Sequence, residues 1–330
     1  MKKNFGTLPD GSCATLYTIQ NEFLTAAVTD LGATLVSLLV PDQKGRKADV
    51  VLGYDSAAEY VRHGNFFGAT VGRYANRIKG GTFLVGDKRV TMDQNEGKNN
   101  LHSGHDFFKN RLWTLEDYQK SSIRFSLQSP DGDQGFPGNA QIHVTYALEN
   151  FALKISYDAV SDQDTVFNLT NHSYFNLAGH DKWERGGKQI LSMPARFIVA
   201  VDDELIPTGE LPSVEGTPFD FREPKAIGRD LGEGLSGYDH TFEVYTSPCA
   251  ILTDPESGRS MAVYTDCPGV QLYSSAGMDQ MGKGGAHYGD SAGICLETQY
   301  YPDSVNHPEW PQPFVKAGEH YHSETVFKFN

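Results

Sequence analysis

Amide, hydroxyl, imidazole and phenol groups follow one another in a single segment of the chain, residues 166–179 (VFNLTNHSYFNLAG). If this segment is extended, every second side chain projects from the same face. That face then carries Asn168, Thr170, His172, Tyr174 and Asn176. Histidine is the side chain that titrates nearest neutral pH, so His172 is a candidate for proton transfer. A second interpretation stays open, in which the segment is a solvated strand face with an incidental histidine.

A carboxylate stands in the second segment of interest, residues 292–301 (AGICLETQYY). Glu297 follows an Ile-Cys-Leu run that indicates a largely buried strand. A buried carboxylate is costly unless it is paired or hydrogen-bonded, and its pKa changes with its surroundings. Glu297 is therefore a candidate general base. The alternative is a structural glutamate that is capped by a neighbouring arginine.

Three shorter polar segments could supply further hydrogen-bonding groups: Asn76 and Arg77 in VGRYANRIKG, His102 in NNLHSG, and Asp239 beside His240 in GYDHTF. The Asn-Arg pair offers donors that suit sugar hydroxyl groups. Each segment also has an ordinary interpretation as an exposed turn, a structural histidine or a turn carboxylate. Taken singly, these segments indicate no particular function.

The elements that must position these groups are predicted to be β-strands. Apolar residues alternate at Ile123–Leu127, Ile142–Leu148 and Leu153–Tyr157. Further strands are predicted at Ala14–Ile19, Phe23–Thr29, Asp49–Leu52, Thr241–Tyr245, Met261–Thr265, Val270–Ser274, Ala292–Gln299 and Thr325–Phe329, and one short helix at Ser56–Val61. The 34 glycines and 16 prolines mark frequent turns. We expect an all-β, antiparallel fold in a single domain that spans residues 1–330.

Composition narrows the possible partners. The chain has 42 acidic and 28 basic residues, a formal charge of −14, which argues against nucleic-acid binding. The N-terminal residues lack the apolar run of a signal peptide, and no stretch is apolar enough to span a membrane. The four cysteines lie far apart, without a CxxC pair, and are expected to be reduced thiols rather than zinc ligands. We therefore expect a cytoplasmic protein.

Six segments, in chain order, together resemble the aldose 1-epimerase family, also called galactose mutarotases: GRYANRIKGG, NNLHSG, DGDQGFPG, TNHSYFNLAG, GYDHTF and ICLETQYYPDSVNHPEWP. They extend from about Phe67 to Pro311. The resemblance implies a large, twisted antiparallel β-sandwich with few short helices, whose concave face holds one monosaccharide. It implies no cofactor and no metal, and it leaves both a monomer and a homodimer open.

The resemblance also implies roles for individual residues. His172 matches the family's general acid and Glu297 its general base. Contacts to the sugar hydroxyls are implied for Asn76, Arg77, His102, Asp239 and Gln271. Ser103 departs from the family pattern, because a glycine usually follows this histidine; the change leaves every functional group in place.

The chemistry of anomer interconversion agrees with these residue types. The C1 hydroxyl must lose a proton while the ring oxygen gains one, which a carboxylate and an imidazolium can do together. His172 would then have to be partly cationic near neutral pH. We expect a nearby carboxylate, Asp239 or Glu297, to raise the pKa of His172.

Three other functions remain open on the sequence alone. An epimerase for a phosphorylated hexose would need an extra cationic cluster for the phosphate, and the candidate segments offer only Arg77 and either Lys79 or Lys283. A glycoside hydrolase or lyase could use Asp239 and Glu297 as paired carboxylates. A non-catalytic sugar-binding protein could have the same fold, but it would have no need of both His172 and Glu297.

Overall fold

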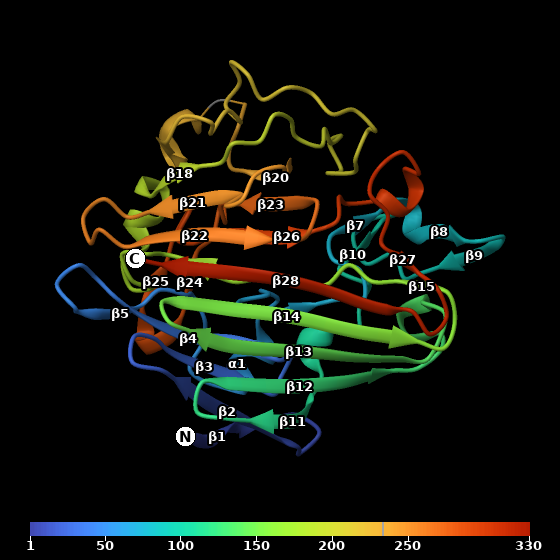
Figure 1. Ribbon diagram of the computed structural model, residues 1–330, viewed down its shortest axis with the longest axis horizontal. Coiled ribbons are helices and arrows are strands. Elements are labelled where there is room, and N and C mark those ends of the chain that lie inside the picture. The colour runs from blue at the N-terminus through green and yellow to red at the C-terminus, as the bar shows by residue number, and fades with distance from the viewer. Residues whose placement is uncertain (233) are drawn as a thin grey trace.

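A computed structural model describes residues 1–232 and 234–330 of the chain. Its largest sheet has nine strands, which run across the view in Figure 1 and pair antiparallel throughout. Their order is β11 (Thr114–Tyr118), β12 (Ser122–Ser129), β13 (Ala140–Glu149), β14 (Ala152–Ser161), β28 (His320–Phe329), β22 (Ser260–Thr265), β21 (Ala250–Thr253), β18 (Ile190–Ser192) and β19 (Lys225–Ala226).

Two smaller sheets complete most of the strand structure. A five-stranded sheet follows chain order: β1 (Lys2–Thr7), β2 (Cys13–Gln20), β3 (Thr25–Thr29), β4 (Thr34–Pro41) and β5 (Lys47–Asp49). A four-stranded sheet has the order β17 (Tyr174–Phe175), β26 (Ile294–Gln299), β23 (Gly269–Tyr273) and β20 (Asp239–Glu243). Because β17 lies far from the other three in sequence, this sheet joins distant parts of the chain.

The remaining strands form two-stranded pairs: β10 (Asn100–Leu101) with β7 (Arg77–Ile78), β15 (Thr165–Val166) with β27 (Phe314–Val315), β16 (Thr170–Asn171) with β6 (Thr70–Val71), β24 (Gln280–Met281) with β25 (His287–Tyr288), and β8 (Thr82–Val85) with β9 (Lys88–Thr91). The helix α1 (Ala57–Arg62) lies within one residue of its prediction. Short 3-10 turns are η1 (Lys79–Gly81), η2 (Phe108–Asn110), η3 (Asp133–Gly135), η4 (Trp183–Lys188), η5 (Ile227–Asp230), η6 (Lys283–Gly285) and η7 (Ser304–Asn306). The all-β prediction is confirmed.

The main core lies between the large sheet and the two smaller ones. Along β13 the buried residues alternate with half-buried ones, and this period of two matches the alternation in the sequence. One hydrophobic cluster contains Ile142 of the nine-stranded sheet, Val28 of the five-stranded sheet and Leu296 of the four-stranded sheet. The three sheets therefore share one core, as expected for a β-sandwich.

One strand prediction was wrong, and the segment that was considered as a possible strand is not a single one. Residues 166–179 do not form one strand, because β15, β16 and β17 each pair with a different partner and His172 falls between β16 and β17. The strand predicted at Asp49–Leu52 instead ends at Asp49, as β5. Both segments leave one neighbouring strand to join another, and alternation in the sequence does not reveal such a change of partner.

In the part of the chain that the structure describes, no helix is long and apolar enough to cross a membrane. The four cysteines are free, and three of them, Cys249, Cys267 and Cys295, are buried.

Candidate active site

The four-stranded sheet positions Glu297. Alternate residues of β26 face opposite sides, and Ile294 and Leu296 belong to the main core. Cys295 and Glu297 therefore face the other side of this sheet. In the register of the sheet Glu297 lies beside Gln271 of β23, and Gln271 lies beside Thr241 of β20. A row of polar side chains thus crosses three strands.

His172 lies directly against this row. Backbone hydrogen bonds hold it on both sides, since its N–H donates to Ala69 (2.9 Å) and its carbonyl accepts from Gly68 (2.9 Å). Its Nε2 lies 3.6 Å from Oε1 of Glu297, and both side chains are more than nine-tenths buried. The second carboxylate oxygen of Glu297 is buried and has no hydrogen-bond partner among the described residues. The site therefore contains an unsatisfied acceptor beside an imidazole.

The opposite edge of the His172 ring faces a thiol. Nδ1 lies 3.5 Å from Sγ of Cys295, so the ligand-type atoms of His172, Cys295 and Glu297 form one group within 4.8 Å. The thiol and the carboxylate face different nitrogens of the ring. A metal ion bound to one ring nitrogen could contact both the Cys295 thiol and the Glu297 carboxylate only if the His172 ring rotated. The arrangement therefore suits proton transfer better than metal binding.

Burial sets the protonation of this pair. It lowers the pKa of His172 to about 4. Burial, with the charge of Asp239 adding to it, raises the pKa of Glu297 well above its usual value, while Arg77 opposes the shift. The prediction that a carboxylate raises the pKa of His172 was therefore wrong in direction. The dominant cause is the loss of solvent around the buried imidazole, which disfavours its charged form.

Arg77 lies in β7 with its guanidinium between two carboxylates. Nε and Nη2 donate to Glu96 at 2.7 and 3.0 Å, and Nη1 lies 3.7 Å from Oδ2 of Asp239. Gln271 donates from Nε2 to Oδ1 of Asp239 at 2.5 Å and accepts a hydrogen bond from the Thr241 hydroxyl. Asn76 and Arg77 are both buried, so the interpretation of this segment as an exposed turn was wrong.

His102 faces the same group of residues. Its Nδ1 accepts a hydrogen bond from the Asn76 N–H (3.0 Å), so in the neutral ring the proton lies on Nε2. Burial, with smaller effects from His172 and Arg77, lowers the pKa of His102 well below its usual value. The rings of His102 and His172 lie 5.7 Å apart, edge to face. His102 is therefore a neutral hydrogen-bond donor next to the proposed acid.

Ser103, where the family pattern has glycine, takes a left-handed backbone conformation (φ 75°) that glycine adopts most easily. Its hydroxyl accepts a hydrogen bond from the Tyr74 N–H (2.8 Å) and donates to the Tyr74 carbonyl (2.9 Å). These two bonds fix the turn after His102.

The seven candidate residues thus form one connected group: Asn76, Arg77, His102, His172, Asp239, Gln271 and Glu297. Three further residues belong to this group and were not predicted from the sequence. Glu96 holds Arg77, and Cys295 touches His172. The ring of Phe66 lies 4.7 Å from that of His102 and 5.7 Å from that of His172. Alternation along β26 could have revealed Cys295, since it lies two residues before Glu297. No pattern indicated Glu96 or Phe66.

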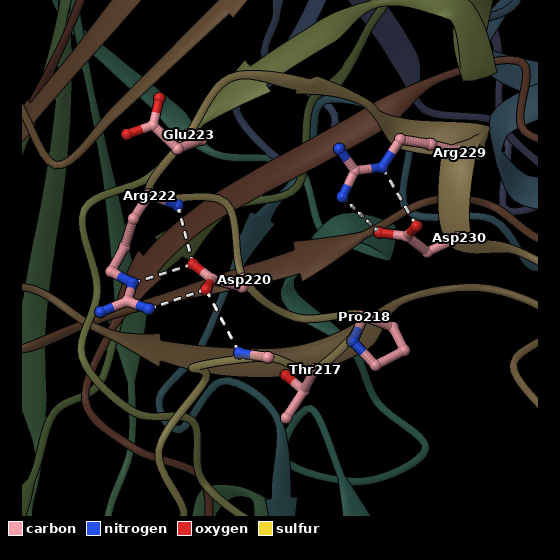
Figure 2. A pocket seen from close by; sticks show the side chains of 8 residues that line it. Thr217, Pro218, Asp220, Arg222, Glu223, Arg229 and Asp230 are labelled. Atoms are coloured by element: carbon pink, nitrogen blue, oxygen red, sulfur yellow. Dashed lines mark hydrogen bonds and ion pairs between the residues drawn. The ribbon is translucent and has the colours of Figure 1, made fainter.

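A separate cavity of about 820 Å³ opens among residues 216–230 and contains none of these seven residues. Figure 2 shows its two arginines, and both already bond carboxylates: Arg222 with Asp220 (2.8 Å) and Arg229 with Asp230 (3.1 Å). Each guanidinium would have to leave its partner to bind a phosphate. This cavity therefore gives no support to a phosphorylated substrate.

Comparison with known proteins finds relatives that match nearly the full length of the chain. The chain is 41% identical to galactose mutarotase of Bos taurus, with 99% of this chain and 97% of the relative covered. It is 40% identical to aldose 1-epimerase of Haemophilus influenzae, with 97% of each covered. The solved GalM/aldose epimerase homologue from C. elegans superposes with a TM-score of 0.90 at 34% identity, over 96% of this chain and 98% of that one.

A family model described as aldose 1-epimerase matches residues 15–328. With full-length relatives at about 40% identity, and with the fold of a solved homologue, the chain belongs to the aldose 1-epimerase family and is an isomerase that interconverts the anomers of aldoses.

Proposed function

We propose that this protein interconverts the α and β anomers of free hexoses, galactose and glucose among them, with His172 as general acid and Glu297 as general base. The observation that carries the assignment is the buried pair itself. Its reactive atoms lie 3.6 Å apart, and Glu297 has an acceptor oxygen that nothing else in the described chain satisfies. A sugar hydroxyl would satisfy that oxygen.

The reaction needs two proton transfers and no change in oxidation state. Glu297 takes the proton of the C1 hydroxyl while His172 gives one to the ring oxygen, and the C1–O5 bond breaks. The product is an open-chain aldehyde with a hydroxyl at C5. Rotation about C1–C2 presents the other face of the aldehyde, and closure reverses both transfers. Each positioned proton transfer contributes about 10²–10⁴-fold to the rate.

The two pKa shifts describe how one proton is shared. A raised pKa at Glu297 and a lowered pKa at His172 favour the neutral pair over the ion pair. Both forms hold one proton, so pH does not choose between them. A bound sugar can favour the ion pair, because its C1 hydroxyl donates a hydrogen bond to a carboxylate and its ring oxygen accepts one from an imidazolium. We infer that sugar binding shifts the shared proton to His172.

The surrounding groups would fix the ring by its hydroxyls. Arg77 and the Nε2–H of His102 are donors, Asp239 is an acceptor, and the amides of Gln271 and Asn76 can do both. Arg77 is balanced by Glu96 and Asp239, so the site carries no surplus of positive charge. A neutral hexose fits this balance, whereas a hexose phosphate would bring unpaired negative charge.

Polarimetry on freshly dissolved sugars tests the proposed substrates. We expect enzyme-dependent mutarotation of α-D-galactose and α-D-glucose, and a much smaller kcat/KM for glucose 6-phosphate. A preference for glucose 6-phosphate would contradict the proposal. Release of reducing sugar from a disaccharide would favour the glycosidase alternative instead.

Replacing Arg77 with alanine tests the binding role. Because hydrogen bonds to a charged group contribute about 1.5–3 kcal/mol, we expect KM to rise at least about tenfold with kcat less affected. The control is Arg89→Ala, since Arg89 is exposed on β9. An unchanged KM in Arg77→Ala would contradict this role.

We also propose a cytoplasmic location and a monomer or homodimer. Free cysteines, three of them buried, support a reducing compartment. Sedimentation analysis of the purified protein would show a larger assembly if the proposed state were wrong.

A further inference from the structure

A buried aspartate braces the backbone that carries Arg77. Asp303 opens the turn η7 just beyond β26 and is fully buried. Its N–H donates to the carbonyl of Arg77 (2.8 Å), and its Oδ1 accepts from the N–H of Lys79 (3.0 Å). One residue therefore bonds the chain at Arg77 and again two residues later.

A second side chain holds the backbone on the other side of Arg77. The side chain of Asn76 accepts a hydrogen bond from the Arg77 N–H at 2.8 Å. Side chains thus hold the backbone both before and after Arg77. The guanidinium in turn lies between Glu96 and Asp239, and a shift of the backbone would move it relative to both carboxylates.

The turn η7 itself has other supports. Backbone hydrogen bonds join Asn306 to Asp303 (2.8 Å) and Ser304 to Tyr301 (3.2 Å), and the Tyr74 hydroxyl bonds Oγ of Ser304 (3.0 Å). Burying the carboxylate of Asp303 costs free energy that these other hydrogen bonds of the turn do not require. Oδ2 of Asp303 is buried without a hydrogen bond among the described residues, and Nε2 of His307 lies 3.7 Å from it. Stability of the turn alone therefore does not account for Asp303.

We propose that Asp303 is a positioning residue for sugar binding, which acts by fixing the backbone of Arg77 through the Lys79 N–H. The proposal rests on the proposed function only in that Arg77 binds the sugar. Misplacing a binding group by even about 1 Å weakens a contact that depends on geometry, so the effect should fall on sugar affinity.

Substitution of Asp303 separates this role from a structural one. Asp303→Ala removes the acceptor, and we expect KM for galactose to rise about tenfold while kcat stays within about threefold of the wild-type value. Asp303→Asn keeps an oxygen at Oδ1 and tolerates the left-handed backbone (φ 55°), so it should restore KM. A fall in kcat without a change in KM, or no rescue by asparagine, would overturn the proposal.

Asn306→Ala is the matched control. It removes the hydrogen bonds from Asn306 Nδ2 to Oδ1 of Asp303 (2.6 Å) and to the Thr82 carbonyl (3.1 Å), but leaves both bonds between Asp303 and the Arg77 segment. KM should not change. An equal rise in KM in this control would show that loosening the turn is sufficient, and would overturn the proposal.

A double-mutant cycle with Arg77 gives the sharpest test. If Asp303 acts through Arg77, Asp303→Ala adds little to the KM of Arg77→Ala. If Asp303→Ala raises KM as much in the Arg77→Ala background as in the wild type, the positioning role of Asp303 is overturned, while the sugar-binding role of Arg77 is not. An unchanged KM in Arg77→Ala itself refutes the sugar-binding role of Arg77 and this proposal with it.

If Asp303→Ala does not fold, Lys79→Pro removes the same hydrogen bond from the donor side. Proline has no N–H and suits the first position of a helical turn, which Lys79 occupies in η1. The same rise in KM is expected, and an unchanged KM in the folded variant would overturn the proposal.

Discussion

At the scale of single residues, the proposed mechanism depends on one shared proton. His172 and Glu297 lie 3.6 Å apart in a buried environment that favours the neutral form of each. The pair works with one proton. At low pH it gains a second, so Glu297 can no longer act as base; at high pH it loses its only proton, so His172 can no longer act as acid.

These proton counts predict a bell-shaped pH profile. We expect kcat/KM to fall on both sides of an optimum, with two apparent pKa values that belong to the pair. The measurement is initial-rate polarimetry across the pH range, with the spontaneous mutarotation at each pH subtracted. A rate that stays constant from acid to alkaline pH would contradict the shared-proton account.

At the scale of elements, the site depends on close contacts beneath His172. Gly68 donates its N–H to the His172 carbonyl and has a left-handed backbone (φ 66°). A Cβ at this position would lie 1.9 Å from the carbonyl oxygen of Leu35 in β4. Backbone atoms of a strand cannot move aside easily, so only glycine fits between β4 and the histidine segment.

Gly68→Ala should therefore destabilise the protein and weaken catalysis together. The left-handed alanine costs about 1–2 kcal/mol, and the clash adds about 1–3 kcal/mol. Gly86→Ala is the control, because Gly86 has a similar φ of 58° but nothing within 4 Å of the added Cβ. Denaturant unfolding should show the larger loss for Gly68→Ala; equal losses would contradict the packing argument.

Long, clearly alternating strands that pair with a neighbour in sequence were predictable, whereas short strands that pair with distant segments were not. β13 and β14 were predictable because they are long, pair with each other and alternate clearly. The segment around His172 was not, because β16 pairs with β6 and β17 with β26, about 100 residues away in one direction and 120 in the other. The residue types indicated the candidate acid and base, but not Glu96, because its role depends on the fold bringing it against Arg77, 19 residues earlier in the chain.

At the scale of the whole molecule, the chain is tied together by distant pairings. β14 pairs with β28 over nine residue pairs, which joins the middle of the chain to its last strand, and one hydrophobic cluster includes residues of all three larger sheets. Such a shared core favours cooperative unfolding. On this basis we propose that residues 1–330 form one domain.

A single domain predicts a single thermal transition. Differential scanning calorimetry at neutral pH should show one endotherm whose calorimetric and van't Hoff enthalpies agree. Two separable transitions, or a stable fragment after limited proteolysis that retains only one of the sheets, would contradict the single-domain assignment.

Polarimetry of Glu297→Gln tests the central claim most directly. Glutamine has nearly the same shape as glutamate but cannot accept the proton of the C1 hydroxyl. We predict a fall in kcat for galactose of about 10²-fold or more, in a protein that unfolds at a temperature no lower than the wild type, because a buried carboxyl with a raised pKa has been replaced by an amide. Near wild-type turnover by Glu297→Gln would contradict the account.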